Sequence, residues 1–228
     1  MRTNLAGVLF GGSCFLCRGA ARAVLCGSCD AELPRLAEPL CPRCALPSPG
    51  GETCGRCLAE PPHYDATLAA LAYVFPADAL VHALKFRGEL ALAPLLGALI
   101  AERIPLGERV DRVIAVPLSA ARLRERGYNQ ALEIARPVAK RLRAPLEFSA
   151  CVRERDTAAQ SDLPWAQRRR NVRGAFRCTR ALLDAHVAVV DDVMTTGATL
   201  DEIAATLKRA GAARVVNWVL ARTFPPDA

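Results

Sequence analysis

Residues 186–201, HVAVVDDVMTTGATLD, limit the possible folds of this chain more than any other segment. An apolar, β-favouring run at 187–190 ends in two adjacent carboxylates, Asp191 and Asp192. A short Thr-Thr-Gly turn follows, and then a helical pattern at 198–209. An open α/β sheet typically forms a ligand-binding site at the carboxyl end of a strand. Such a site is built from the strand, polar residues at its end, a turn of small residues and the helix that follows. The segment therefore predicts an α/β domain with a mainly parallel sheet and helices on both faces.

The same turn predicts a site for a sugar phosphate. Its backbone N–H groups and the positive end of the following helix suit a phosphate, and its hydroxyls add donors. Asp191 and Asp192 suit ribose hydroxyls, or a Mg²⁺ ion that bridges to the ligand. The alternative is an ordinary helix cap, which uses only one such side chain. The predicted 5′-phosphate site consists of Thr195, Thr196, Gly197, Ala198 and Thr199.

Eight of the ten cysteines form four Cys-x-x-Cys pairs near the N-terminus. These cysteines are Cys14, Cys17, Cys26, Cys29, Cys41, Cys44, Cys54 and Cys57. Two such pairs supply four thiolates that close tetrahedrally on one Zn²⁺, so we expect two structural zinc ions. We expect the first pair to join the second and the third to join the fourth, although spacing alone leaves an interleaved pairing open. A redox role would need a βαβ context, which this segment lacks.

The cysteine-rich segment is dominated by Gly, Pro and Cys, so zinc binding must supply its folding free energy. We therefore expect a double zinc-ribbon module at 1–62 and a second domain at 63–228. No targeting segment is recognisable, which predicts a cytoplasmic protein, and no apolar run is long enough for membrane insertion. In the reducing cytosol, clustered cysteines favour metal binding over disulfides.

The net charge of +7 permits a polyanionic partner such as nucleic acid. However, only Lys85, Lys140 and Lys208 are lysines among the 30 basic residues, and the chain is rich in alanine. Such a bias is also typical of genome composition, so the charge alone does not identify a DNA-binding protein.

The second domain alternates strand and helix patterns, as a doubly wound sheet does. Helical patterns occupy 77–86, 90–104, 129–143 and 198–209, with Pro137 predicting a kink or break. Strand patterns occupy 67–75, 110–116, 146–152, 175–177, 187–190 and 214–220.

Four segments carry a family resemblance. They are VHALKFRGE (81–89), VPLSAARLRERGYNQA (116–131), RERDTAAQSDLPWAQRRRNVRGAF (153–176) and VVDDVMTTGATL (189–200). With the cysteine pairs before them, they resemble the ComF family of competence-associated proteins. The last segment also resembles the phosphoribosyl pyrophosphate (PRPP) signature of type I phosphoribosyltransferases. The resemblance implies that fold and, in several bacteria, a role in DNA uptake during natural transformation.

A pyrophosphate site is expected at the end of the 110–116 strand, where a turn offers N–H groups and arginine forks match phosphate oxygens. Its candidates are Leu118, Ser119, Arg122, Arg126 and Lys85. A solvated, basic helix start and a lysine that only ends a helix are the alternatives.

The loop at 153–173 resembles the mobile hood of this fold, which would close over PRPP and exclude water. Its candidate residues are Arg153, Thr157, Gln160, Arg168 and Asn171. A plain basic surface loop is the alternative.

The resemblance implies attack at the ribose anomeric carbon with loss of pyrophosphate, with Asp191 and Asp192 as the catalytic pair and Mg²⁺ bound with PRPP. Ribose 5-phosphate, single-stranded DNA and competence-machinery proteins are further candidate partners. Two alternatives remain open. One is a single-stranded DNA-binding competence factor without turnover, and the other is a salvage enzyme that joins a nucleobase or amine to PRPP.

Overall fold

The computed structural model describes residues 12–155 and 171–225. Five parallel strands form the central sheet in the order β3-β9-β8-β4-β5. Their bounds are Ala66–Ala72 for β3, Arg214–Arg222 for β9, His186–Met194 for β8, Arg112–Ala115 for β4 and Leu146–Glu147 for β5. Nearly every residue of β8 and β9 is buried, as expected for strands covered on both faces.

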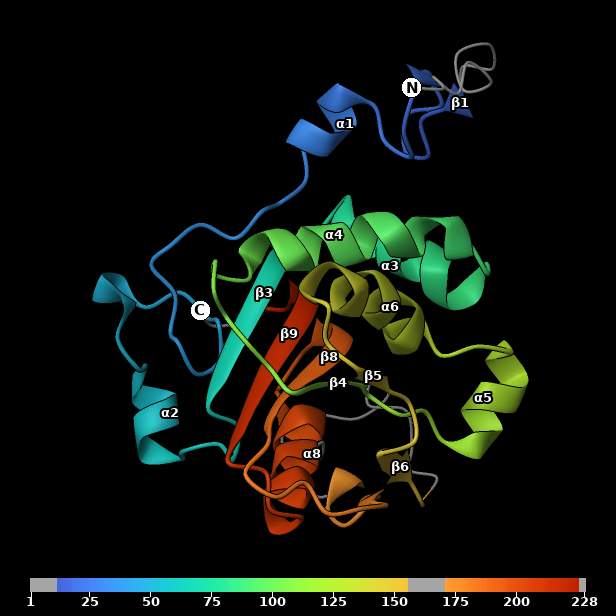
Figure 1. The fold of residues 1–228 in the computed structure, drawn as a ribbon. Coiled ribbons are helices and arrows are strands. Elements are labelled where there is room, and N and C mark those ends of the chain that lie inside the picture. The colour runs from blue at the N-terminus through green and yellow to red at the C-terminus, as the bar shows by residue number, and fades with distance from the viewer. Residues whose placement is uncertain (1–11, 156–170, 226–228) are drawn as a thin grey trace, which may run out of the picture.

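Helices cover both faces of this sheet. The helices α3 (Ala77–Phe86), α4 (Ala93–Arg103) and α6 (Gln130–Leu142) lie together on one side, with the short η3 (Leu90–Leu92) between α3 and α4. The helix α8 (Ala198–Arg209) lies on the other side (Figure 1). This architecture confirms the predicted α/β class. Pro137 does not break α6, which continues from Gln130 to Leu142.

The connections reverse direction at one point of the sheet. The chain moves from β3 to β4 and from β4 to β5 in one direction, but from β8 to β9 in the other. Right-handed crossovers then place α4 and α6 on one face and α8 on the opposite face. The reversal lies between the neighbouring strands β4 and β8, and ligands of open α/β sheets bind at such a point.

The N-terminal module comprises β1 (Gly12–Ser13), β2 (Ala20–Ala21), α1 (Gly27–Ala31), η2 (Pro49–Gly51) and α2 (Gly55–Ala59). In Figure 1, β1 and α1 lie beyond α4, whereas α2 lies beside the sheet. Residues 34–36, between α1 and η2, run antiparallel to β3. The Leu36 N–H donates to the Ala70 carbonyl at 3.1 Å, and the Ala72 N–H donates to the Pro34 carbonyl at 2.8 Å. This segment covers an edge strand that would otherwise expose unpaired backbone groups.

A separate antiparallel ribbon is formed by β6 (Cys151–Arg153) and β7 (Phe176–Cys178). The single strand predicted at 146–152 was therefore wrong, because β5 and β6 belong to different sheets. The remaining helix, α5 (Ala120–Arg126), follows β4. Among the described residues, no helix combines the length and apolarity that crossing a bilayer requires.

Candidate functional site

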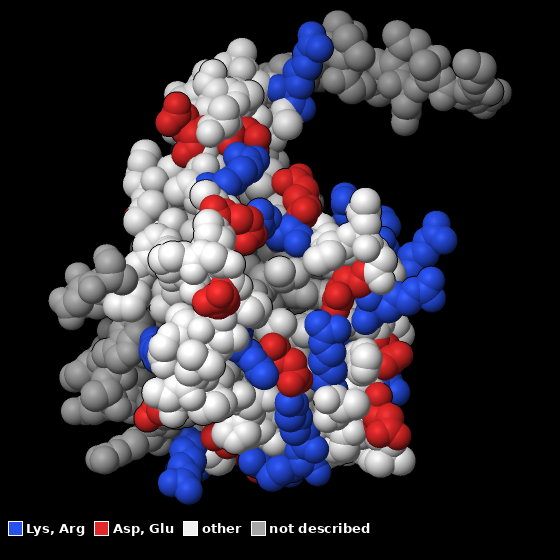
Figure 2. All heavy atoms as spheres, turned by 90° about the vertical axis from the view of Figure 1, so that its left-hand side faces the viewer, with Lys and Arg blue, Asp and Glu red and all other residues white. Residues whose placement is uncertain are grey.

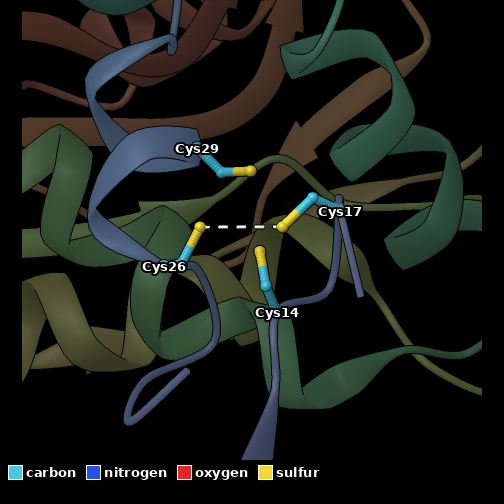
Figure 3. Close-up of side chains that lie close together, drawn as sticks. All are labelled: Cys14, Cys17, Cys26 and Cys29. Atoms are coloured by element: carbon cyan, nitrogen blue, oxygen red, sulfur yellow. Dashed lines mark hydrogen bonds between the residues drawn. The ribbon is translucent and has the colours of Figure 1, made fainter. Parts of the chain in front are cut away.

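The eight paired cysteines gather into two groups of four. Cys14, Cys17, Cys26 and Cys29 form one group, and Cys41, Cys44, Cys54 and Cys57 form the other, with the sulfurs of each group within 4.8 Å of one another. This confirms the sequential pairing. Figure 3 shows the four sulfurs of the first group pointing toward a common centre.

The sulfur geometry fits zinc. The Cys17 and Cys26 sulfurs lie 3.7 Å apart, as do those of Cys44 and Cys54. Tetrahedral zinc with bonds of about 2.3 Å requires sulfurs separated by about 3.8 Å. In the second group, the Cys54 N–H donates to the Cys41 sulfur at 3.3 Å, which favours a thiolate. Because protein sulfur fills all four positions, both sites are structural zinc sites.

A cavity of about 860 Å³ opens at the carboxyl ends of β3, β4 and β8. It therefore lies at the point where the sheet connections reverse. It brings together most of the predicted ligand-binding residues: Lys85, Leu118, Arg122, Arg126, Arg153, Asp191, Asp192, Thr195, Gly197, Ala198 and Thr199.

Three other predicted residues that the structure describes, Ser119, Thr196 and Asn171, do not line the cavity. Ser119 is buried and caps α5, accepting from the Arg122 N–H at 3.4 Å. Thr196 is also buried, and its hydroxyl accepts from the Ala198 N–H at 3.1 Å. Asn171 is described but is not part of the lining. Thr157, Gln160 and Arg168 lie outside the described residues.

The acidic pair lies within a strand rather than after it. The strand expected at 187–190 extends to Met194, because β9 continues to pair with it as far as Arg222. On its other side, β4 pairs only up to Val190. Asp191 and Asp192 therefore follow the position where β4 separates from β8, and this separation opens the cavity beside them.

Lys85 and burial set the charge of the acidic pair. The Lys85 ammonium lies 3.0 Å from a carboxylate oxygen of Asp192. Burial alone would lower the pKa of Lys85, but the Asp192 carboxylate raises it. Burial, together with the neighbouring Asp192, raises the pKa of Asp191 to about 8. In the ligand-free cavity Lys85 therefore pairs with Asp192, and the neighbouring Asp191 ionises less readily than an exposed aspartate.

The turn after β8 requires glycine at position 197. Gly197 has φ +83°, in the left-handed region, and forms the N-terminal cap position of α8. A Cβ at this position would lie 2.7 Å from Met194 Cε and 3.0 Å from the Tyr64 hydroxyl. The glycine is therefore required both by its backbone conformation and by protein atoms packed against it.

The segment Tyr128-Asn129-Gln130 supports the other wall. The Tyr128 hydroxyl donates to the carbonyl of Leu84, next to Lys85. Asn129 accepts from the first N–H groups of α6 and donates to the Val116 carbonyl at 3.0 Å. Gln130 accepts from Arg126. These three side chains therefore hold the end of β4, the end of α3 and one cavity arginine in place.

Sequence reasoning missed several lining residues: Tyr73, Phe86, Glu125, Tyr128, Gln130 and Val193. Tyr73 directly follows β3, so the rule that sites form at carboxyl ends of parallel strands was the available signal. Phe86 lies under the Arg126 guanidinium, 5.5 Å from the ring centre, a contact between separate helices that spacing does not reveal.

Charges of both signs are interspersed on the face seen in Figure 2, which includes the covered edge of the sheet. On this face the net positive charge is not gathered into one basic patch.

Comparisons with known proteins match both halves of the chain. A double zinc ribbon domain family matches residues 5–58, and a phosphoribosyl transferase domain family matches residues 129–223. DNA utilization protein YhgH of Escherichia coli O157:H7 is 39% identical over 93% of this chain and 98% of its own length. Competence protein F of Haemophilus influenzae is 30% identical over 92% of this chain and 96% of its own. Among solved structures, the allosteric regulatory enzyme of purine biosynthesis is 23% identical, covering 57% of this chain and 25% of its own, with a TM-score of 0.39.

Proposed function

This chain belongs to the ComF family, with a double zinc ribbon before a phosphoribosyltransferase domain, and we propose that its cavity binds PRPP or ribose 5-phosphate together with Mg²⁺. One observation carries the proposal. Two buried carboxylates and a glycine-capped helix start line one cavity at the reversal point of the sheet.

Each part of PRPP can be assigned to a different group of residues that line the cavity. The 5′-phosphate would bind the turn from Thr195 to Thr199, at the positive end of α8. The ribose hydroxyls would bind Asp191 and Asp192. The pyrophosphate would lie toward the turn at Leu118 and the guanidinium groups of Arg122 and Arg126, which line the same cavity.

The donor set also suits Mg²⁺, which is usually held by one or two carboxylates and by substrate phosphates. Asp191 and Asp192 are the carboxylates that would hold it, and when bound it would neutralise charge on the pyrophosphate. Lys85 already balances one carboxylate, so the pair stays compatible with an anionic ligand close by.

Such a site would support transfer of the 5-phosphoribosyl group from PRPP to an acceptor nitrogen, with pyrophosphate as the leaving group. The protein would contribute positioning and stabilisation of the leaving group, since this chemistry needs no protein nucleophile. A salvage reaction with a nucleobase or amine is one form of this activity.

The binding test compares wild-type protein with the Asp191→Asn, Asp192→Asn double variant by calorimetry with PRPP and Mg²⁺. Charge-assisted hydrogen bonds contribute about 1.5–3 kcal/mol each, so the double variant should bind at least about tenfold more weakly. Wild-type protein that binds neither PRPP nor ribose 5-phosphate would contradict the proposal.

Single-stranded DNA binding without turnover is the second candidate, and the names of two relatives, DNA utilization protein and competence protein, favour it. The same two proteins should be compared in a single-stranded DNA shift assay over a range of salt concentrations. If the cavity serves PRPP, the double variant keeps its DNA affinity or gains some, because a phosphate backbone is repelled less. A double variant that loses DNA binding but keeps PRPP binding would favour the second candidate.

A further inference from the structure

Two arginines donate hydrogen bonds to backbone carbonyls at the end of β8 and in the turn that follows it. Arg222 Nη1 donates to the Met194 carbonyl at 2.9 Å and to the Thr195 carbonyl. Arg56 Nη2, from α2 of the zinc module, donates to the Thr196 carbonyl at 2.6 Å. Three successive carbonyls of the turn thus accept from guanidinium groups.

These contacts fix the direction of the turn's N–H groups. In a trans peptide the N–H points opposite to the carbonyl. Holding the carbonyls of residues 194 to 196 therefore directs the N–H groups of Thr195, Thr196 and Gly197 away from the arginines. A rotated peptide would instead present a carbonyl oxygen to a bound phosphate, which repels it.

Arg222 also joins this turn to the second zinc site. Its side chain is fully buried, and its Nε donates to the Cys44 carbonyl at 2.8 Å. Four thiolates around one Zn²⁺ carry a net negative charge, so the loaded site acts as a counter-charge for this buried cation.

The chain that leaves the zinc module makes two more contacts with the same region. The buried Tyr64 places its hydroxyl against Gly197. The His63 N–H donates to the Asp201 carboxylate at 2.6 Å, in the first turn of α8. The second zinc ribbon and the two residues that follow it therefore contact the turn and the start of α8, whereas the first ribbon lies beyond α4 (Figure 1).

We propose that Arg56 and Arg222 are positioning residues that couple the second zinc site to the turn, so that zinc at Cys41, Cys44, Cys54 and Cys57 preorganises the N–H groups that receive phosphate. The ligand assignment rests on the proposed function, whereas the coupling itself does not. The first zinc site has no part in it.

Arg56 offers the cleaner test, because it is exposed on α2 whereas Arg222 is fully buried. Hydrogen exchange of the peptide spanning 194–200 is measured in zinc-loaded protein without ligand, and PRPP–Mg²⁺ affinity is measured on the same samples. Losing one hydrogen bond from an exposed arginine should make the turn of Arg56→Ala exchange about five- to tenfold faster and weaken PRPP binding by a similar factor. Arg56→Lys should restore part of both, and Arg22→Ala, with the same charge change in the first ribbon, should change neither.

A second pair of variants separates the two zinc sites. Cys57→Ser should speed exchange of the turn at least as much as Arg56→Ala, and Cys17→Ser in the first site should leave it at the wild-type rate. Equal effects of the two cysteine variants, or an Arg56→Ala turn that exchanges at the wild-type rate, would overturn the coupling. Weaker PRPP binding with unchanged exchange would also overturn it, since Arg56 would then contact the ligand directly. If wild-type protein binds no PRPP, the proposed function fails. The coupling between the second zinc site and the turn is then tested by hydrogen exchange of the peptide 194–200 alone.

Discussion

At the scale of single residues, the acidic pair determines the charge in the cavity. Adjacent carboxylates in a buried place rarely ionise together, and here Lys85 pairs with Asp192 while the pKa of Asp191 rises to about 8. The folded-state pKa of Asp191 therefore lies above the ordinary aspartate value of 3.8. Protonated Asp191 stabilises the fold fully below its unfolded pKa, and this contribution is lost as the pH rises through about 8.

Asp191→Asn removes the titration without changing the shape of the side chain. The free energy of unfolding of the variant, relative to wild type, should therefore increase between pH 5 and pH 9 by at least about 1.4 kcal/mol, the equivalent of one pKa unit. Thermal or urea unfolding of ligand-free protein at several pH values measures this difference. Asp184→Asn, at an exposed position, is the control, and its free energy of unfolding should differ from that of wild type by the same amount at every pH. Parallel curves for Asp191→Asn as well would mean that Asp191 is ionised throughout this range.

At the scale of elements, α4 and α6 pack tightly against each other at Gly97. A Cβ at Gly97 would lie 2.3 Å from Pro137 Cγ and 2.8 Å from the Ile134 carbonyl oxygen. Pro137 does not break α6, and it packs against Gly97 on the neighbouring helix. Sequence periodicity cannot reveal this, because the fit involves two helices that meet only in the folded chain.

Gly97→Ala should therefore destabilise the protein, although alanine favours helices. Overpacking of this kind costs about 1–3 kcal/mol, and here a backbone carbonyl cannot move aside. Denaturant unfolding measures the change. Gly55→Ala is the matched control, since a Cβ on that helical glycine meets nothing within 4 Å and should leave stability nearly unchanged. Equal midpoints for Gly97→Ala and wild type would contradict the packing.

At the scale of the whole molecule, periodicity and spacing predicted the parallel sheet, the two four-cysteine groups and the position of the cavity. These are local patterns, and each is set by residues close in sequence. The contacts between modules were not predictable. Arg56 and Thr196 are separated by 140 positions, and Arg222 and Cys44 by 178. Nothing near either arginine in the sequence marks it as a partner of the turn. The extension of β8 through the acidic pair was also missed, because it depends on the length of β9.

The expected domain boundary lies between residues 62 and 63, but hydrogen bonds cross it. Arg56 of the second ribbon donates to the Thr196 carbonyl, and Arg222 donates to the Cys44 carbonyl. We therefore expect the phosphate site to behave as a joint product of both modules.

The most direct measurement is an experimental structure of the zinc-loaded protein with PRPP and Mg²⁺. The 5′-phosphate should lie at the N–H groups of residues 195 to 199 and the ribose hydroxyls at Asp191 and Asp192, with the Thr196 carbonyl still bound to Arg56. PRPP found elsewhere, or a cavity that stays empty at saturating PRPP, would contradict PRPP binding at this cavity.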